Sequence, residues 1–429
     1  MAITSSIQNF FAVIMDGTHP LIHFTYPCHP LITAFYRIMK TAISASNKPI
    51  GLLIIFLVFL THLSSCTSHS PLSTQESEIS TMEATTPPST GLPAQLFYLD
   101  EGQIWKLKQD GQKTTQITQE SISVDAFDFN PQSQKLVFLS GNQLFLVDAE
   151  GHEREILVEG QPLPPLNDDT IQLTFPEDSV NAIHSPLWSQ DGSQIAFIAD
   201  GLQVLDLSTN QTQTIWRNSI DSSTPVIVDR LLSWSPDGNF FLVSKSTFSP
   251  EYSHQRSLGL IRVGEYMVDL SDHTDLTFAW SPDSQYVYLA DANHGSDRSL
   301  MQCNLIDVQC KLIAEFEPGI RYYHYAYPFV NEQSQLYVWL GTSQEFGEPP
   351  ENFQLESTQP GYGRTSLRDD QFPIQAALWA HDGSGVIIVI SKDTDNHPSG
   401  SMLWLTLQGD SSLYLPPSGA TNLRWGFSE

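Results

Sequence analysis

The chain has 429 residues, and its 48 acidic residues outnumber its 20 lysines and arginines, which gives a net charge of −28. A nucleic-acid partner is therefore not expected, because a phosphate-binding surface needs clustered cations. Hydrophobic residues make up 40% of the chain, and turn-forming Gly, Pro, Asn, Asp and Ser recur at short intervals, which is typical of an all-β protein.

The first recognisable element is an apolar run at residues 50–60, preceded by Lys40 and Lys48. Such a run is too short to cross a bilayer's hydrocarbon core, which needs about 20 residues, but it suits the hydrophobic region of a signal peptide. It is followed by Leu63-Ser64-Ser65-Cys66, which resembles the bacterial lipoprotein signal. That resemblance implies that Cys66 is acylated and becomes the first mature residue.

Residues 1–65 are thus interpreted as a signal region. Residues 1–38 do not fit a signal peptide, whereas 39–65 has an ordinary length for one, so Met39 is expected to be the true start. An uncleaved membrane anchor through the same segment is the alternative. Both interpretations place the body of the protein in the cell envelope, facing the periplasm or the cell exterior.

Residues 67–94 contain twelve Ser or Thr and four Pro, with no aromatic residue and no Lys or Arg. A segment of this composition cannot bury enough apolar surface to fold. It predicts a disordered tether with a reach of roughly 30 Å, which holds the body away from the membrane.

One pattern recurs in residues 95–429: an aromatic or apolar residue, a polar turn and a β-prone strand. The fullest copy is Trp234-Ser235-Pro236-Asp237-Gly238, and most copies lie 46 to 50 residues apart, a period that indicates a propeller. Pro, Asp and Gly suit a tight turn, and the aromatic residue suits packing between sheets. The repeat positions predicted to be structural are Trp188, Asp191, Trp234, Asp237, Trp280, Asp283, Trp379, Asp382 and Trp425.

Six copies are present, and the two chain ends complete a seventh. Leu96–Thr118 resembles the second to fourth strands of a blade, and Thr421–Phe427 resembles its missing first strand. The sequence therefore predicts an all-β propeller of about seven four-stranded blades, with six or eight as alternatives. The N- and C-terminal segments would close the ring and remove the exposed sheet edges.

The repeated Trp-Ser-Pro-Asp-Gly resembles the TolB-like propeller family, which is related to WD-repeat-like and prolyl oligopeptidase propellers. The resemblance covers the chain from Gln95 onward and implies the fold, but these propellers serve unrelated functions. TolB also carries an α/β domain before its propeller, and propeller peptidases carry Gly-x-Ser-x-Gly on a hydrolase domain. Neither feature is present here, so neither activity is carried over.

No cofactor and no metal are expected, because none of the nine histidines after Cys66 has a partner at metal-binding spacing. The candidate ligand-binding residues are Tyr322, Tyr323, His324, Tyr325 and Tyr327, near the expected innermost strand of the sixth repeat. Alternate residues of a strand share a face, so one ladder of this segment would line the channel or its rim. The alternative is that both ladders pack between blades.

Two long insertions, Gly160–Asn181 and Gly341–Gln371, are expected to be loops, and loops on a rigid scaffold often carry binding function. A disulfide is expected between Cys303 and Cys310, because the residues around them look like hairpin arms meeting near Ile306 and Asp307. The exported location permits oxidation.

The function expected from the sequence is a lipid-anchored envelope protein whose propeller binds a protein, a peptide or a glycan, or serves as a scaffold. The alternative is a propeller hydrolase or lyase that acts on carbohydrate or peptide, since carboxylates from different blades can converge across a ring. Because of the excess of carboxylates, neutral or cationic partners are favoured.

Overall fold

The computed structural model describes residues 91–160, 182–220, 224–248, 255–292, 300–313, 322–345, 348–358, 363–407, 412–417 and 419–428. These residues form 28 strands and no helix. Accordingly, the described part of the chain holds no helix of the length and apolarity that a membrane crossing requires.

The strands form seven four-stranded antiparallel sheets, numbered here as blades 1 to 7. Blade 1 contains β28 (Thr421–Trp425), β1 (Leu96–Asp100), β2 (Gln103–Leu107) and β3 (Thr114–Gln116). Blade 2 contains β4 (Val124–Asn130), β5 (Lys135–Ser140), β6 (Gln143–Asp148) and β7 (Glu155–Glu159). Blade 3 contains β8 (His184–Trp188), β9 (Gln194–Ile198), β10 (Gly201–Asp206) and β11 (Gln211–Arg217).

Blade 4 contains β12 (Val226–Trp234), β13 (Phe240–Thr247), β14 (Gln255–Arg262) and β15 (Met267–Ser271). Blade 5 contains β16 (Leu276–Trp280), β17 (Tyr286–Asp291), β18 (Leu300–Asn304) and β19 (Cys310–Leu312). Blade 6 contains β20 (Tyr322–Val330), β21 (Leu336–Ser343), β22 (Phe353–Thr358) and β23 (Arg364–Phe372). Blade 7 contains β24 (Ile374–Trp379), β25 (Gly385–Ile390), β26 (Met402–Thr406) and β27 (Ser412–Leu415).

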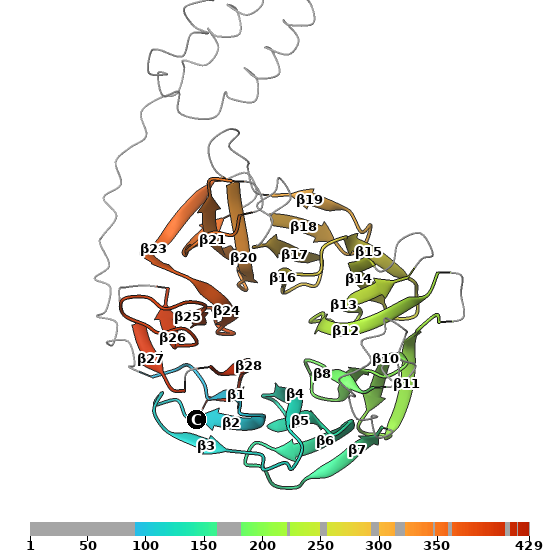
Figure 1. Ribbon diagram of the computed structural model, residues 1–429. Coiled ribbons are helices and arrows are strands. Elements are labelled where there is room, and N and C mark those ends of the chain that lie inside the picture. The colour runs from blue at the N-terminus through green and yellow to red at the C-terminus, as the bar shows by residue number, and fades with distance from the viewer. Residues whose placement is uncertain are drawn as a thin grey trace, which may run out of the picture. The chain divides into compact units, whose positions relative to one another are not determined.

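The blades are arranged as a β-propeller, with the first strand of each blade nearest the centre of the ring (Figure 1). The ring closes where β28, from the C-terminal end, pairs with β1: Leu96 lies opposite Trp425, and Phe97 lies opposite Arg424. The predicted fold, the number of blades and the closure by the two chain ends are confirmed.

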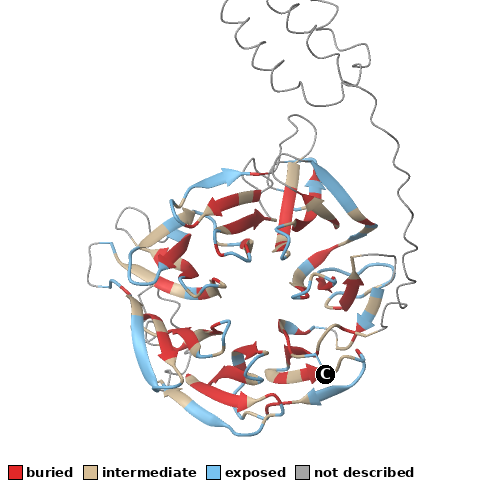
Figure 2. Cartoon of the chain, turned by 180° about the vertical axis from the view of Figure 1, so that it is seen from behind, coloured by how far each residue is buried: buried red, intermediate tan, exposed pale blue. Residues whose placement is uncertain are grey.

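Burial follows the position of a strand within its blade (Figure 2). The middle strands pack against neighbouring blades on both faces, and all six residues of β25 are buried. The outermost strands are largely exposed, as in β19, where all three residues are exposed. Seven hydrophobic clusters of described residues hold the ring together. Each of them joins two adjacent blades, as where Leu242 of blade 4 and Leu289 of blade 5 share one cluster.

Repeat tryptophans join adjacent blades by hydrogen bonds as well as by packing. The indole N–H of Trp280 donates to Ser233 Oγ of the preceding blade at 2.7 Å, and that of Trp379 donates to the carbonyl oxygen of Tyr327 at 2.9 Å. Trp425 donates to the carbonyl oxygen of Trp379 at 2.6 Å. These bonds give the repeated aromatic residue a structural role at each of the three junctions.

In four repeats the turn that follows the tryptophan is held by its aspartate, which is Asp191, Asp237, Asp283 or Asp382. Asp237 Oδ1 accepts hydrogen bonds from Ser235 Oγ at 2.6 Å and from the backbone N–H of Asn239 at 3.1 Å. Gly238 has a φ of +76°, a left-handed conformation that most residues avoid. The sequence expectation for Ser-Pro-Asp-Gly therefore matches the local geometry.

The folded body begins before Gln95. Leu92 is buried against blades 1 and 7, and its backbone N–H donates to the carbonyl oxygen of Gln109 at 2.8 Å. Residues 91–94, which composition assigned to the tether, are therefore part of the propeller.

Candidate functional site

The aromatic segment in β20 lies on the innermost strand of blade 6, as expected. His324 is fully buried: Nε2 lies 2.8 Å from Ser343 Oγ, and Nδ1 lies 2.9 Å from the carbonyl oxygen of Ala292. Tyr325 is 1% exposed and packs against blade 5. Neither side chain can contact a ligand without rearrangement of the blade.

Tyr327 lies at a β-bulge and has a φ of +46°. Its hydroxyl donates to the carbonyl oxygen of Gln375, and its ring packs beside blade 7. Burial raises the pKa of Tyr327 to about 12, so the phenol remains a neutral donor. Tyr327 therefore links blades 6 and 7.

The remaining tyrosines, Tyr322 and Tyr323, are half-buried. The guanidinium of Arg364 lies 4.4 Å from the centre of the Tyr323 ring, and its Nε lies 3.9 Å from Glu356 Oε2. Burial raises the pKa of Glu356, although the nearby Arg364 opposes this shift. The side chains expected to line the channel therefore mostly make contacts within and between blades. Three of the five candidate residues, Tyr322, Tyr323 and Tyr327, remain partly exposed.

The segment Gly341–Gln371 is not the long loop that its composition suggested. It contains the end of β21, all of β22 and most of β23, so its Glu and Pro residues lie around regular strands. Of the other predicted insertion, Gly160–Asn181, residues 161–181 lie outside the described residues, as does Cys66.

A hollow of about 450 Å³ lies between blades 4 and 5. Its walls are four hairpin turns, two from each blade, because the first-to-second and third-to-fourth strand turns of a blade lie on the same face of the ring. The walls include Asp237, Arg262, Glu265, Asp283, Leu305 and Ile306.

Three carboxylates and one guanidinium face this hollow. Burial opposes ionisation of Asp237, but hydrogen bonds from Ser235, Asn239 and Ser284 outweigh it and lower its pKa. Arg262 pairs with Glu265, with Nη1 3.2 Å from Oε1. The walls therefore carry a net negative charge.

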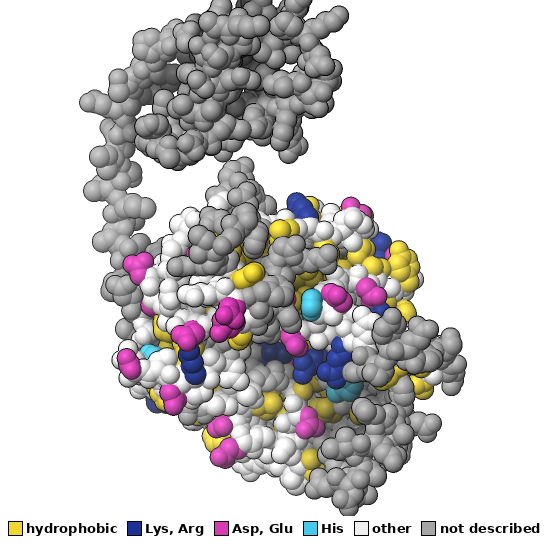
Figure 3. Space-filling view, turned by 45° about the horizontal axis from the view of Figure 1, so that its top comes forward, with side chains coloured by type: hydrophobic (Ala, Val, Ile, Leu, Met, Phe, Trp, Pro, Cys, Tyr) yellow, Lys and Arg dark blue, Asp and Glu magenta, His cyan; other side chains and the backbone are white. Residues whose placement is uncertain are grey.

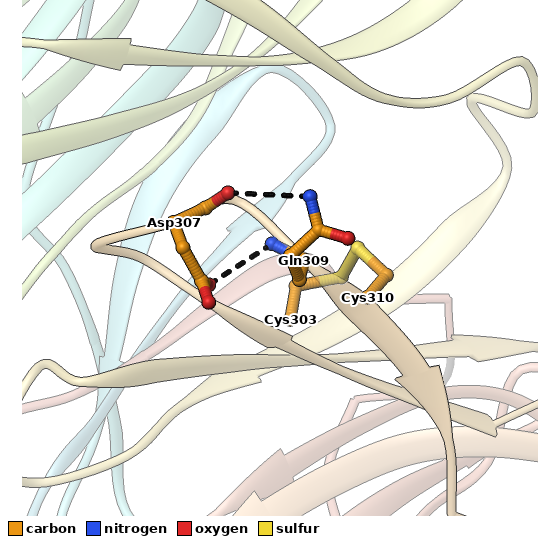
Figure 4. The surroundings of a disulfide bond; sticks show 4 residues. All are labelled: Cys303, Asp307, Gln309 and Cys310. Carbon is orange, nitrogen blue, oxygen red and sulfur yellow. Dashed lines mark hydrogen bonds between the residues drawn. A yellow bond between two sulfur atoms is a disulfide. The ribbon is translucent and has the colours of Figure 1, made fainter.

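The rim of the hollow is apolar and rigid on the blade 5 side. Ile306, at the tip of the β18–β19 hairpin, is 78% exposed, and Val263 of blade 4 is 40% exposed. Cys303 and Cys310 lie opposite each other in this hairpin, with Cα atoms 3.9 Å apart, and are joined by a disulfide (Figure 4). The covalent link fixes the turn that presents Ile306.

Sequence reasoning missed this hollow, although one signal was available. The turns at Val263 and Ile306 carry large apolar residues where a solvent-exposed turn normally carries small or polar ones. Among the residues that the structure describes, no group of three or more His, Cys, Asp or Glu is placed to hold a metal ion.

Comparison with known proteins identifies no matching family model and no matching curated protein. Among solved structures, an oligogalacturonate lyase in complex with manganese aligns over 75% of this chain and 85% of its own, with 13% identity and a TM-score of 0.48. The tricorn protease aligns over 78% and 34%, with 12% identity and a TM-score of 0.49. TolB from Acinetobacter baumannii aligns over 76% and 79%, with 12% identity and a TM-score of 0.39. Likeness at this level concerns the fold alone, so no activity is carried over.

Proposed function

We propose that this protein is a lipid-anchored binding module of the cell envelope whose propeller holds a polypeptide partner between blades 4 and 5. The observation that carries the proposal is the hollow of about 450 Å³, which combines ionised walls with exposed apolar side chains on its rim. Concave sites with a few placed polar groups are the usual form of a binding site.

The charges of the hollow favour a basic segment. Asp237, Glu265 and Asp283 face it together with Arg262, and the whole chain carries a net charge of −28. A Lys or Arg of the partner would face the carboxylates, and an apolar neighbour would contact Ile306 or Val263. The long-range field of the protein would also accelerate the approach of such a partner.

A rigid rim supports tight binding. The disulfide holds the turn of Ile306 before the partner arrives, so less conformational entropy is lost on association. The large exposed fraction of Ile306 also means that a partner can bury much apolar area there.

Binding is tested with the full-length protein in detergent and a fluorescent peptide of alternating Lys and Leu. We expect saturable binding that weakens as salt is raised, and no binding of the matched Glu–Leu peptide. Ile306→Ser should weaken the Lys–Leu peptide at least about fivefold, as expected for a buried contact at the centre of an interface. Ile156→Ser, which changes another exposed isoleucine on blade 2, is the matched control.

The proposal fails if the Lys–Leu peptide binds equally well to wild type and Ile306→Ser, or if the two peptides bind alike. Binding of a neutral oligosaccharide in competition with the peptide would instead indicate a glycan partner at the same hollow.

The lipid anchor is supported by the apolar run and by Leu63-Ser64-Ser65-Cys66. We expect mass spectrometry of protein extracted from membranes to find an acylated N-terminal Cys66, and Cys66→Ala to release the protein from the membrane fraction. A protein that begins elsewhere without acylation, with Cys66→Ala unchanged in location, would contradict the anchor without affecting the binding proposal.

A further inference from the structure

Basic side chains are scarce in this chain, with 20 Lys and Arg against 48 Asp and Glu, yet several gather near the centre of one face of the propeller (Figure 3). Blade 4 carries two arginines near Asp229: Arg230 on β12 follows it in the chain, and Arg256 on β14 lies beside its carboxylate. Arg230 is exposed, and the side chain of Arg256 is 62% exposed.

A β-bulge places an acidic residue beside these arginines. Val228 of β12 pairs with Lys245 and Arg230 pairs with Ser244, so Asp229 is the extra residue of the strand. Its Oδ2 accepts a hydrogen bond from Ser246 Oγ at 2.6 Å and lies 3.6 Å from Arg256 Nε. Bulges of this kind often redirect a side chain at the rim of a closed sheet.

The Oδ1 oxygen of Asp229 is buried and accepts no hydrogen bond from any residue that the structure describes. The carboxylate offsets one of the two arginine charges, so the group of Asp229, Arg230 and Arg256 retains a net positive charge within a strongly acidic chain.

His184, at the start of β8 in blade 3, completes the cluster. Burial lowers its pKa to about 4; the charge of Asp229 opposes this shift, and the charge of Arg230 adds to it. The imidazole is therefore neutral near neutral pH and can donate one N–H. Its Nδ1 lies 3.3 Å from Ser185 Oγ.

We propose that Arg230, Arg256 and His184 form a binding site for the anionic group of a small ligand, a carboxylate or a phosphate. Guanidinium groups match the geometry of both anions and bind them through paired hydrogen bonds. The neutral imidazole adds a donor without adding charge.

This site is separate from the hollow between blades 4 and 5. Neighbouring strands are antiparallel, so the first and third strands of each blade begin on one face, and the hairpin turns that build the hollow lie on the opposite face. His184 and Arg256 lie at the beginnings of β8 and β14. The inference therefore goes beyond the proposed function: its ligand has the opposite charge and binds elsewhere.

The test is a titration of the full-length protein in detergent with inorganic phosphate and, separately, with glucuronate, followed by calorimetry. We expect saturable binding of at least one probe. Arg230→Gln and Arg256→Gln should each weaken it by about tenfold, the loss expected for a charge-assisted pair. Arg230→Lys, which keeps the charge but not the planar fork, should lie between Arg230→Gln and wild type.

Arg154→Gln, at an exposed arginine on blade 2, is the matched control and should bind as wild type does. Binding of phosphate alone would assign a phosphate ligand, and binding of glucuronate alone a carboxylate ligand. The inference is overturned if neither probe binds, or if both Arg→Gln variants of blade 4, folded as judged by circular dichroism, bind as wild type does. The Lys–Leu peptide titration, repeated with these variants, reports separately on the other face.

Discussion

Loss of the disulfide between Cys303 and Cys310 should lower the melting temperature of the propeller by a few degrees. The two cysteines are seven residues apart, and closing so short a loop in the unfolded chain stabilises the native state by about 2.4 kcal/mol on the chain-entropy model. The folded unit spans 87–429, which implies an unfolding entropy of about 0.7 kcal/mol per kelvin. The expected decrease in Tm is therefore about 3 °C.

Cys310→Ala is the better perturbation, because Cys310 is exposed whereas Cys303 is fully buried in the core between blades 4 and 5. Replacing Cys303 would add the cost of a cavity. The assay is thermal unfolding followed by circular dichroism, with and without dithiothreitol. Dithiothreitol should lower the Tm of wild type by the same amount and leave Cys310→Ala unchanged. A wild-type Tm that does not respond to the reductant would refute the reasoning.

Three further predictions follow from contacts between blades. Deleting the chain from Thr421 onward removes β28 and exposes the edge of β1, so the truncated protein should aggregate or lose cooperative unfolding, and a normal melt would contradict the closure. Arg424→Met should lower the free energy of unfolding in urea by about 2 kcal/mol, because Asp128 Oδ1, 2.6 Å from Arg424 Nε, loses its partner. Adding Asp128→Asn to this variant should restore part of the lost stability. If the effects of the two substitutions on the free energy of unfolding simply add, the two side chains are not coupled and the prediction is wrong. The pKa of His184 is about 4 in the folded protein and 6.5 in the unfolded chain, so its contribution to the free energy of unfolding should fall by about 3 kcal/mol as the pH drops from 6.5 to 4. His184→Gln should remove this contribution. If the variant loses stability with falling pH as steeply as wild type does, the prediction is wrong.

The architecture was predictable because its determinants are local and repeated. The turn residues Ser235 to Gly238 and the tryptophan before them recur at a nearly constant spacing, and each copy specifies one hairpin and one junction between blades. Pairing of Cys303 with Cys310 followed from symmetry about a short turn, which is also a local property.

Side-chain environments were not predictable in the same way. The alternation of side chains between the two faces of a strand correctly places Tyr323 and Tyr325 on one face of β20. Packing of the adjacent blade, however, decides which of the two is buried. Burial of His324 depends on Ser343, at the end of β21, and on Ala292, which follows β17 of the neighbouring blade. A single sequence contains the period of the blades but not the distances between them.

The period nevertheless indicates where sites between blades can form. Asp237 and Asp283 are one repeat apart and face the same hollow, and His184 and Arg230 are also one repeat apart and lie close enough for their charges to interact. Equivalent positions of successive repeats thus meet at one junction, on one face or the other according to which end of the strand they occupy. Since the rigid sheet separates the two faces, an anion bound beside Arg230 should not change the affinity of a basic peptide at the hollow. A coupling between the two would require movement of blade 4 as a unit.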